Sequence, residues 1–166
     1  GAVGYHFGSK AEHIRALVVD GAQLIDARRQ GELARFAADG GEPALEDVVG
    51  TLVYPSIGLA GPGEEEYYNR FVVLFAMAHR DQFMEALAGR WNTGFQACIK
   101  LLRGHMSHLP PRQQTERIVF IESYLGAVLA ARETRLADDT RAHSIWSTTD
   151  VLDHLVHTIC AIVKAP

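Results

Sequence analysis

The side chains in this sequence that are best suited to chemistry are histidines. His105 and His108 are three residues apart, as are His154 and His157, and this spacing places both imidazoles of a pair on one face of a helix. Two imidazoles can begin a zinc site, but we find no carboxylate or thiol in the local sequence that completes either one. Favourable contact with the last carbonyls of a helix explains His105 and His108 better. We therefore expect no metal and no other cofactor.

Serine, histidine and aspartate, which together can perform hydrolysis, are all present, but they occur in no pattern that signals catalysis. The chain has no Gly-x-Ser-x-Gly turn for a nucleophile. It also has no Gly-x-Gly-x-x-Gly sequence and no P-loop for a nucleotide. We expect a protein that is not an enzyme.

The composition is typical of one globular domain. The 166 residues are 48% hydrophobic, and the formal charge of −4 gives no general attraction for nucleic acid or for an anionic membrane. No apolar run approaches the roughly 18 residues that a membrane span needs. Cys98 and Cys160 lie in apolar helical patterns, which predicts buried thiols in a reducing compartment. We expect a cytoplasmic protein without membrane contact.

Helical periodicity runs through the whole chain, and no alternation typical of strands persists. Gly40 and Gly41 end a first long helix, and a second helix begins near Pro43 and ends near Tyr54, before Pro55. The acidic residues 64–66 predict the start of a third helix. Asp81 predicts the start of a fourth helix, which continues through Trp91 and Phe95 to Leu102. We expect about six helices in an all-α fold.

The penultimate helix, residues 113–137, is apolar on two sides. One row holds Ile118, Ile121, Leu125 and Val128, and another begins at Phe120 and continues through Tyr124. The final helix, which begins after Thr148, also has a wide apolar stripe. Such helices indicate either central burial or a second partner.

The stretch Tyr5-His6-Phe7-Gly8-Ser9-Lys10 stands almost at the start of the chain. Ser9 and Glu12 have the spacing of a capping box, which predicts that a helix begins at about Lys10. Followed by a long connecting helix and by helices that close with a doubly apolar pair, this stretch resembles the tetracycline-repressor (TetR) family of transcriptional regulators. In that family, a Tyr-His-Phe-x-x-Lys run follows the recognition helix of a helix-turn-helix. The match in motifs covers only about residues 1–20.

The resemblance implies a division of the chain into a remnant of the DNA-binding domain (residues 1–9) and a connecting helix with a ligand-binding and dimerisation domain (residues 10–166). It implies a TetR-like bundle that forms a homodimer through its last two helices. In the complete protein, Tyr5, His6 and Lys10 would contact the phosphate backbone of operator DNA. The helices that should come before Gly1 are not in this sequence, so the chain as given should not bind an operator.

The resemblance also implies a small hydrophobic or amphipathic inducer held inside each body. Aromatic residues at helical spacing form either plain core or the wall of such a ligand site, and those that we expect to line it are Phe71, Phe75, Trp91, Phe95 and Tyr124. The residues that we expect at the dimer interface are Ile118, Ile121, Leu125, Val128, Leu152, Leu155 and Ile159.

The function expected on this basis is a ligand-responsive transcriptional regulator, with a repressor as the favoured form. The alternative is a helical module that binds a small molecule and dimerises but never contacts DNA. The coding sequence upstream of Gly1 separates the two, because a regulator needs a basic helix-turn-helix there.

Overall fold

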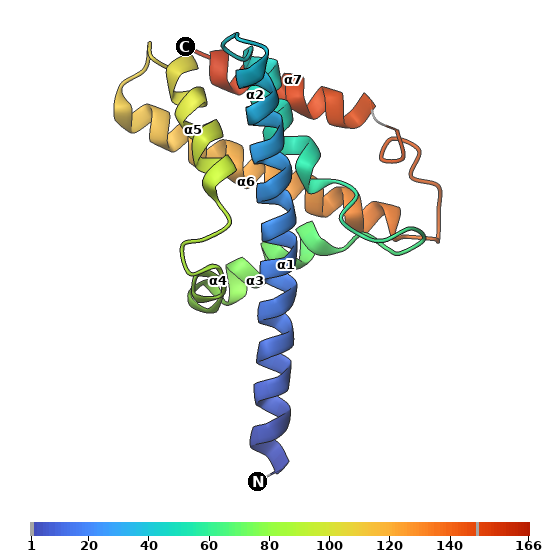
Figure 1. The fold of residues 1–166 in the computed structure, drawn as a ribbon. Helices are drawn as coiled ribbons and strands as arrows, with labels where there is room; N and C mark the ends of the chain where they lie inside the picture. Colours follow the sequence, from blue (N-terminus) through green and yellow to red (C-terminus); the bar gives the residue numbers. More distant parts are fainter. Residues whose placement is uncertain (1, 149) are drawn as a thin grey trace.

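The computed structural model describes the backbone of residues 2–148 and 150–166, and the side chains of the same ranges from residue 10 onward. This part of the chain is all-helical, as the periodicity predicts, and has seven α-helices and one 3-10 turn instead of about six helices (Figure 1). In chain order they are α1 (Ala2–Ala38), α2 (Leu45–Val53), η1 (Tyr54–Ser56), α3 (Tyr68–Ala78), α4 (Arg80–Leu87), α5 (Thr93–His105), α6 (Pro111–Leu136) and α7 (Asp150–Lys164).

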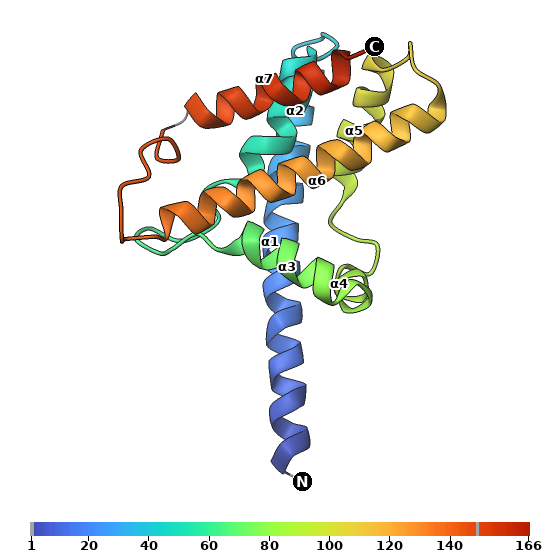
Figure 2. The same ribbon diagram turned by 180° about the vertical axis from the view of Figure 1, so that it is seen from behind.

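Helix α1 is the longest element, and its N-terminal end extends beyond all the other helices (Figures 1 and 2). Its 37 residues correspond to a rod of about 55 Å at a rise of 1.5 Å per residue. The prediction that a helix begins at Lys10 is wrong, because α1 runs without a break from Ala2. No proline interrupts these residues, and Gly8 and Ser9 inside a helix cost too little to end one that is already nucleated.

Helix α2 and the turn η1 follow the prediction closely. The helix ends at Val53, and Pro55 lies in the single 3-10 turn that follows. Proline lacks the N–H that would continue the helix, which explains the change. All but the first-turn acidic residues of α2 are buried, so this short helix is part of the hydrophobic core.

Helix α3 begins at Tyr68, four residues later than the acidic residues 64–66 predict. Two of these carboxylates bind loop N–H groups instead: that of Glu64 accepts from Gly61 at 3.1 Å, and that of Glu66 accepts from Gly58 at 2.9 Å. The N-terminus of α3 is satisfied from another element, because the Glu133 carboxylate accepts from the backbone N–H groups of Asn69 and Arg70 at 2.9 and 2.7 Å. A distant carboxylate therefore fixes where α3 begins.

The single helix predicted from Asp81 to Leu102 is two helices, α4 and α5, joined by residues 88–92. Ala88 and Trp91 have φ values of 47° and 62°, and Gly89 has a φ of 68°. A left-handed conformation costs a residue other than glycine roughly 1–2 kcal/mol, so the helical pattern alone could not reveal this break.

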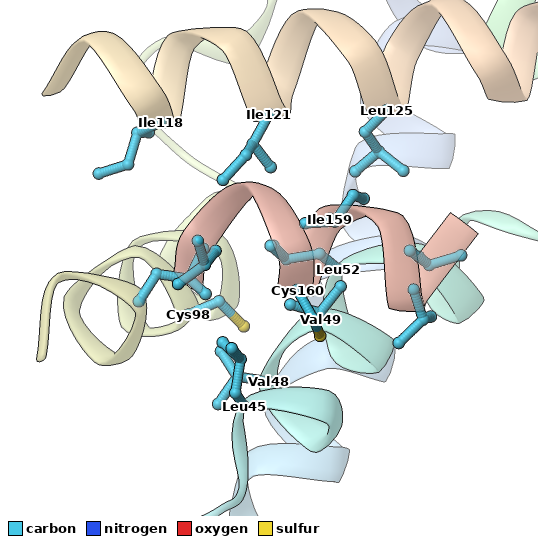
Figure 3. Close-up of a cluster of buried hydrophobic side chains, with 14 of the residues drawn as sticks. Leu45, Val48, Val49, Leu52, Cys98, Ile118, Ile121, Leu125, Ile159 and Cys160 are labelled. Carbon is cyan, nitrogen blue, oxygen red and sulfur yellow. The ribbon is translucent and has the colours of Figure 1, made fainter. Parts of the chain in front are cut away.

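Helices α6 and α7 lie side by side on one face, with α3 on the other side of α6 (Figure 2). The apolar row of α6 that contains Ile118, Ile121 and Leu125 points toward α7 and α2 (Figure 3). Ile159 of α7 is completely buried in the same cluster. The hydrophobic core therefore lies between α2, α5, α6 and α7.

Both cysteines are buried in this core as free thiols, as the sequence predicts. Burial raises the pKa of the Cys98 thiol to about 11, since the charged thiolate would lose its hydration. Within the described residues, no helix is both long enough and apolar enough to cross a membrane.

Candidate ligand site and pairing surface

A pocket of about 560 Å³ lies between the N-terminal half of α1, helix α3 and helix α4, and we call it the α1–α4 pocket. Its lining residues are Lys10, Ala11, Glu12, Ile14, Arg15, Phe75, Gln82, Glu85 and Ala86. Two cationic and two anionic side chains surround an apolar strip, so the pocket carries little net charge. This mixture suits a small amphipathic molecule better than an ion.

Lys10, expected to contact DNA, is exposed and lines this pocket. The side chains of Tyr5 and His6, the other two expected contacts, lie outside the described residues; their backbone is helical. All three positions lie toward the N-terminal end of α1, the end that extends from the body (Figure 1).

The five aromatic residues expected to line a ligand site do not share one cavity. Phe71 and Phe75 stack on α3 with ring centroids 5.7 Å apart, and of the five only Phe75 lines the α1–α4 pocket. Phe95 lies beneath the Arg29 guanidinium at 5.6 Å and packs against the hydrophobic core. Tyr124 is on the outer side of α6. The helical spacing of these residues therefore does not bring them together.

Trp91, the fifth aromatic residue, lies in the connection between α4 and α5. Its indole Nε1 is buried and has no hydrogen-bond partner among the described residues. A buried N–H without an acceptor is rare in folded proteins, because the lost hydration is not replaced.

A second, smaller pocket of about 240 Å³ lies beside Tyr68, between α1, the loop before α3 and the end of α6. Four carboxylates line it, from Asp20, Glu64, Glu66 and Glu133, and no basic residue does. One oxygen of Glu66 accepts from the Gly58 N–H at 2.9 Å, and its buried Oε2 atom has no hydrogen-bond partner among the described residues but forms an ion pair with Arg132 Nη1 at 3.7 Å.

Two contacts attach α1 to the body where glycines allow a close approach. The Tyr68 hydroxyl donates to the Val18 carbonyl at 2.8 Å, and its ring lies so close to α1 that a Cβ atom at Gly21 would be 2.1 Å from it. The Asp26 carboxylate accepts from the Gly94 N–H at 2.7 Å, at the start of α5. We call these the Tyr68 contact and the Asp26 contact.

Sequence reasoning missed Asp26 and Glu133, which are 3% and 2% exposed. A signal for both existed in the helical spacing. Glu133 follows Leu129 by four residues and so continues the buried row of α6, and Asp26 stands eight residues after the fully buried Val18. A carboxylate that continues an apolar row has to find donors inside the protein, and free N–H groups at a helix start provide them.

Six of the seven residues expected at a dimer interface are buried inside the single chain. Leu125, the most exposed of the six, is 8% exposed, and Ile159 is inaccessible (Figure 3). Val128 is partly exposed and packs against the same core. This placement corrects the expectation: the row through Ile118 and Leu125 forms the chain's own core, because α2 and α7 already cover it.

The other side of α6 remains uncovered in the single chain. Phe120 is 64% exposed and Tyr124 is 37% exposed, and on the adjacent helix α3 Leu74 and Met77 are 66% and 82% exposed. Helices α3 and α6 approach closely at Gly126, whose position lies beside Val73. We call these four exposed residues the outer apolar face. Figure 2 shows the two helices that carry them, α3 and α6.

The described residues contain no group of three or more histidine, cysteine or acidic side chains placed to hold a metal ion. Comparisons of the chain with protein-family models, with curated proteins and with solved structures found no match.

Proposed function

We propose that the complete protein is a ligand-responsive transcriptional repressor of the TetR type, acting as a homodimer. The observation that carries the proposal is the form of α1, which extends from the body at one end and is attached to α3 and α5 at the other. A rod held in this way transmits a small change of tilt in the body to whatever its free end carries. The aromatic run before Lys10 lies on that free end.

The α1–α4 pocket supports the ligand-dependent part of the proposal. A molecule bound there would contact Lys10 and Arg15 on α1, Phe75 on α3 and Gln82 on α4 together. It would favour the tilt of α1 at which these contacts are best, and only this difference in affinity between two tilts can switch DNA binding.

The outer apolar face supports the dimeric part. Four large apolar side chains from α3 and α6 lie uncovered, and on the adjacent α7 the exposed residues include His154 and His157. A second copy related by two-fold symmetry would cover Phe120 and Tyr124 with the same residues of its own α6. This arrangement would hold two α1 rods at a fixed separation, as recognition of two half-sites requires.

The decisive experiment uses the complete gene product, including the coding sequence upstream of Gly1. Double-stranded DNA of random sequence would be selected on the immobilised protein, and binding of the recovered sequence would then be measured with and without small amphipathic compounds. We expect a palindromic site and a loss of affinity with at least one compound. Selection of no sequence would defeat the proposal.

Pairing is tested separately by sedimentation equilibrium of the 166-residue chain. Phe120→Glu should convert a dimer to a folded monomer, since it places a charge in the outer apolar face. Gln96→Glu adds the same charge at an exposed position of α5 and should leave the dimer unchanged. A wild-type chain that is monomeric at micromolar concentration would contradict the pairing.

The alternative, a small-molecule-binding helical module without a DNA-binding domain, predicts a different result. A start codon directly before Gly1, together with a stable dimer, would favour it. A basic helix-turn-helix in the upstream sequence would instead favour the regulator.

A further inference from the structure

The connection between α4 and α5, residues 88–92, departs most from the pattern of its own sequence, and we call it the α4–α5 junction. Leu87, Trp91, Phe95 and Cys98 follow one another at helical spacing, and no proline occurs between Arg80 and His105. The local sequence thus permits one continuous helix. The structure nevertheless breaks the helix here.

The broken form contains strain that a continuous helix would remove. Ala88 and Trp91 are the two residues other than glycine that have positive φ in the described part of the chain. Side chains with a Cβ atom disfavour this conformation, and it persists only where surrounding contacts require it. The Trp91 indole N–H is also left without an acceptor.

Contacts with α1 hold the broken form in place. The Asp26 carboxylate accepts from the Gly94 N–H at 2.7 Å, and in a continuous helix this N–H would donate to the carbonyl of residue 90 instead. A Cβ atom at Gly94 would lie 2.6 Å from the Arg29 Cβ, so α5 begins directly against α1. Helix α4 contacts α1 as well, although Ala86 is its only buried residue.

We propose that the α4–α5 junction is a two-state switch, with the broken form in equilibrium with a form in which residues 80–105 are one continuous helix. In the continuous form α4 follows the axis of α5 and leaves α1, so the α1–α4 pocket loses the wall that Gln82, Glu85 and Ala86 provide. A molecule in this pocket favours the broken form. That last consequence rests on the proposed ligand response, whereas the two-state junction does not.

The test uses fluorine NMR of the 166-residue chain labelled with 5-fluorotryptophan. The two tryptophans, Trp91 and Trp146, give two signals, and Trp146→Phe assigns them. Gly89→Ala should raise the ratio of continuous to broken form about 30-fold to 100-fold, because alanine resists the φ of 68° and favours a helix. A second Trp91 resonance should then appear, and amides 89 and 91–93 should gain protection from hydrogen exchange, since the N–H groups of Ala88 and Arg90 already donate to backbone carbonyls in the broken form.

Two further variants complete the design. Ala88→Gly relaxes the broken form and disfavours a helix, so it should lower the same ratio by a similar factor, about 30-fold to 100-fold. Gly31→Ala strengthens a helix far from the junction, at a position with open space around it, and should leave the Trp91 signal unchanged. The proposal is overturned if Gly89→Ala produces no second Trp91 resonance, or if the Trp91 and Trp146 signals change together, as they would on general unfolding.

Discussion

Different interactions hold two regions of the molecule together. One region is the core between α2, α5, α6 and α7, and the other is the side formed by α1, α3 and α4. In the core, large aliphatic side chains such as Leu52, Leu102 and Ile159 are inaccessible to solvent. On the other side, α3 has no buried residue, and single polar groups such as Tyr68 and Asp26 make the attachments. Dense apolar packing resists change, whereas a few directional contacts can break one at a time. The first region is suited to a scaffold and the second to a moving part.

The largest expected effect on stability comes from a substitution in the core. Ile159→Ala removes a completely buried side chain and should lower the free energy of unfolding by about 4 kcal/mol, since the packed surroundings cannot close the cavity. Urea unfolding measures this change. Ile145→Ala makes the same substitution where the side chain is 70% exposed and should change stability by less than about 0.5 kcal/mol. Equal effects from the two variants would contradict the assigned core.

The second prediction separates the two regions. Glu133→Ala removes the acceptor of the Asn69 and Arg70 N–H groups and should cost about 3 kcal/mol. The loss should appear first in hydrogen exchange of α3, with the core amides less affected. Glu116→Ala, on the exposed side of the same helix, should cost about 0.5 kcal/mol. Equal loss of protection in α3 and α7 would show that the two regions unfold as one.

The third prediction concerns the Tyr68 contact. Gly21→Ala places a Cβ atom where the Tyr68 ring lies, so α3 and α1 must separate, at a cost of about 2 kcal/mol. Gly31→Ala, on the same helix in open space, should instead stabilise by up to about 1 kcal/mol. Thermal unfolding of both variants gives the comparison. Adding Tyr68→Ala to Gly21→Ala should remove the clash, and strictly additive losses would mean that the two positions do not interact.

Helical periodicity predicted the elements of the core well because they are amphipathic or buried. Helix α2, helix α6 and the final helix all lie where their apolar rows indicate. The failures concern the start of α1, the start of α3 and the boundary between α4 and the core helix α5. The start of α3 is set by Glu133, which is 64 residues away from Asn69, and the break after α4 coincides with contacts to α1. Local patterns hold no information about such partners.

Candidate site residues were harder to predict than helices for a related reason. Apolar spacing indicates that the side chains of Phe75 and Phe95 face the inside of the protein, but it does not show whether they line the same cavity. The residues expected at the dimer interface show a second ambiguity. A row such as Ile118 to Leu125 is equally apolar whether it packs against its own chain or against another. Only the packing of α2 and α7 decides between them.

The smallest expected effect tests whether polar contacts matter less where water reaches them. Asp138, in the connection before α7, accepts hydrogen bonds from Thr140 and contacts His143 at 2.7 Å, and these interactions hold the pKa of its carboxyl well below its usual range. A depressed pKa in the folded state gives stability that is complete above the unfolded value, near pH 4, and is lost as the pH falls further.

Asp138→Asn should therefore lower the urea midpoint slightly at pH 7, and its difference from the wild type should shrink as the pH falls from 5 toward 2. Asp139→Asn, which changes the exposed neighbouring residue, serves as the control and should follow the wild type throughout. A loss as large as that of Glu133→Ala would contradict the comparison, because a partly exposed carboxylate in the connection would then matter as much as a buried one that fixes a helix start.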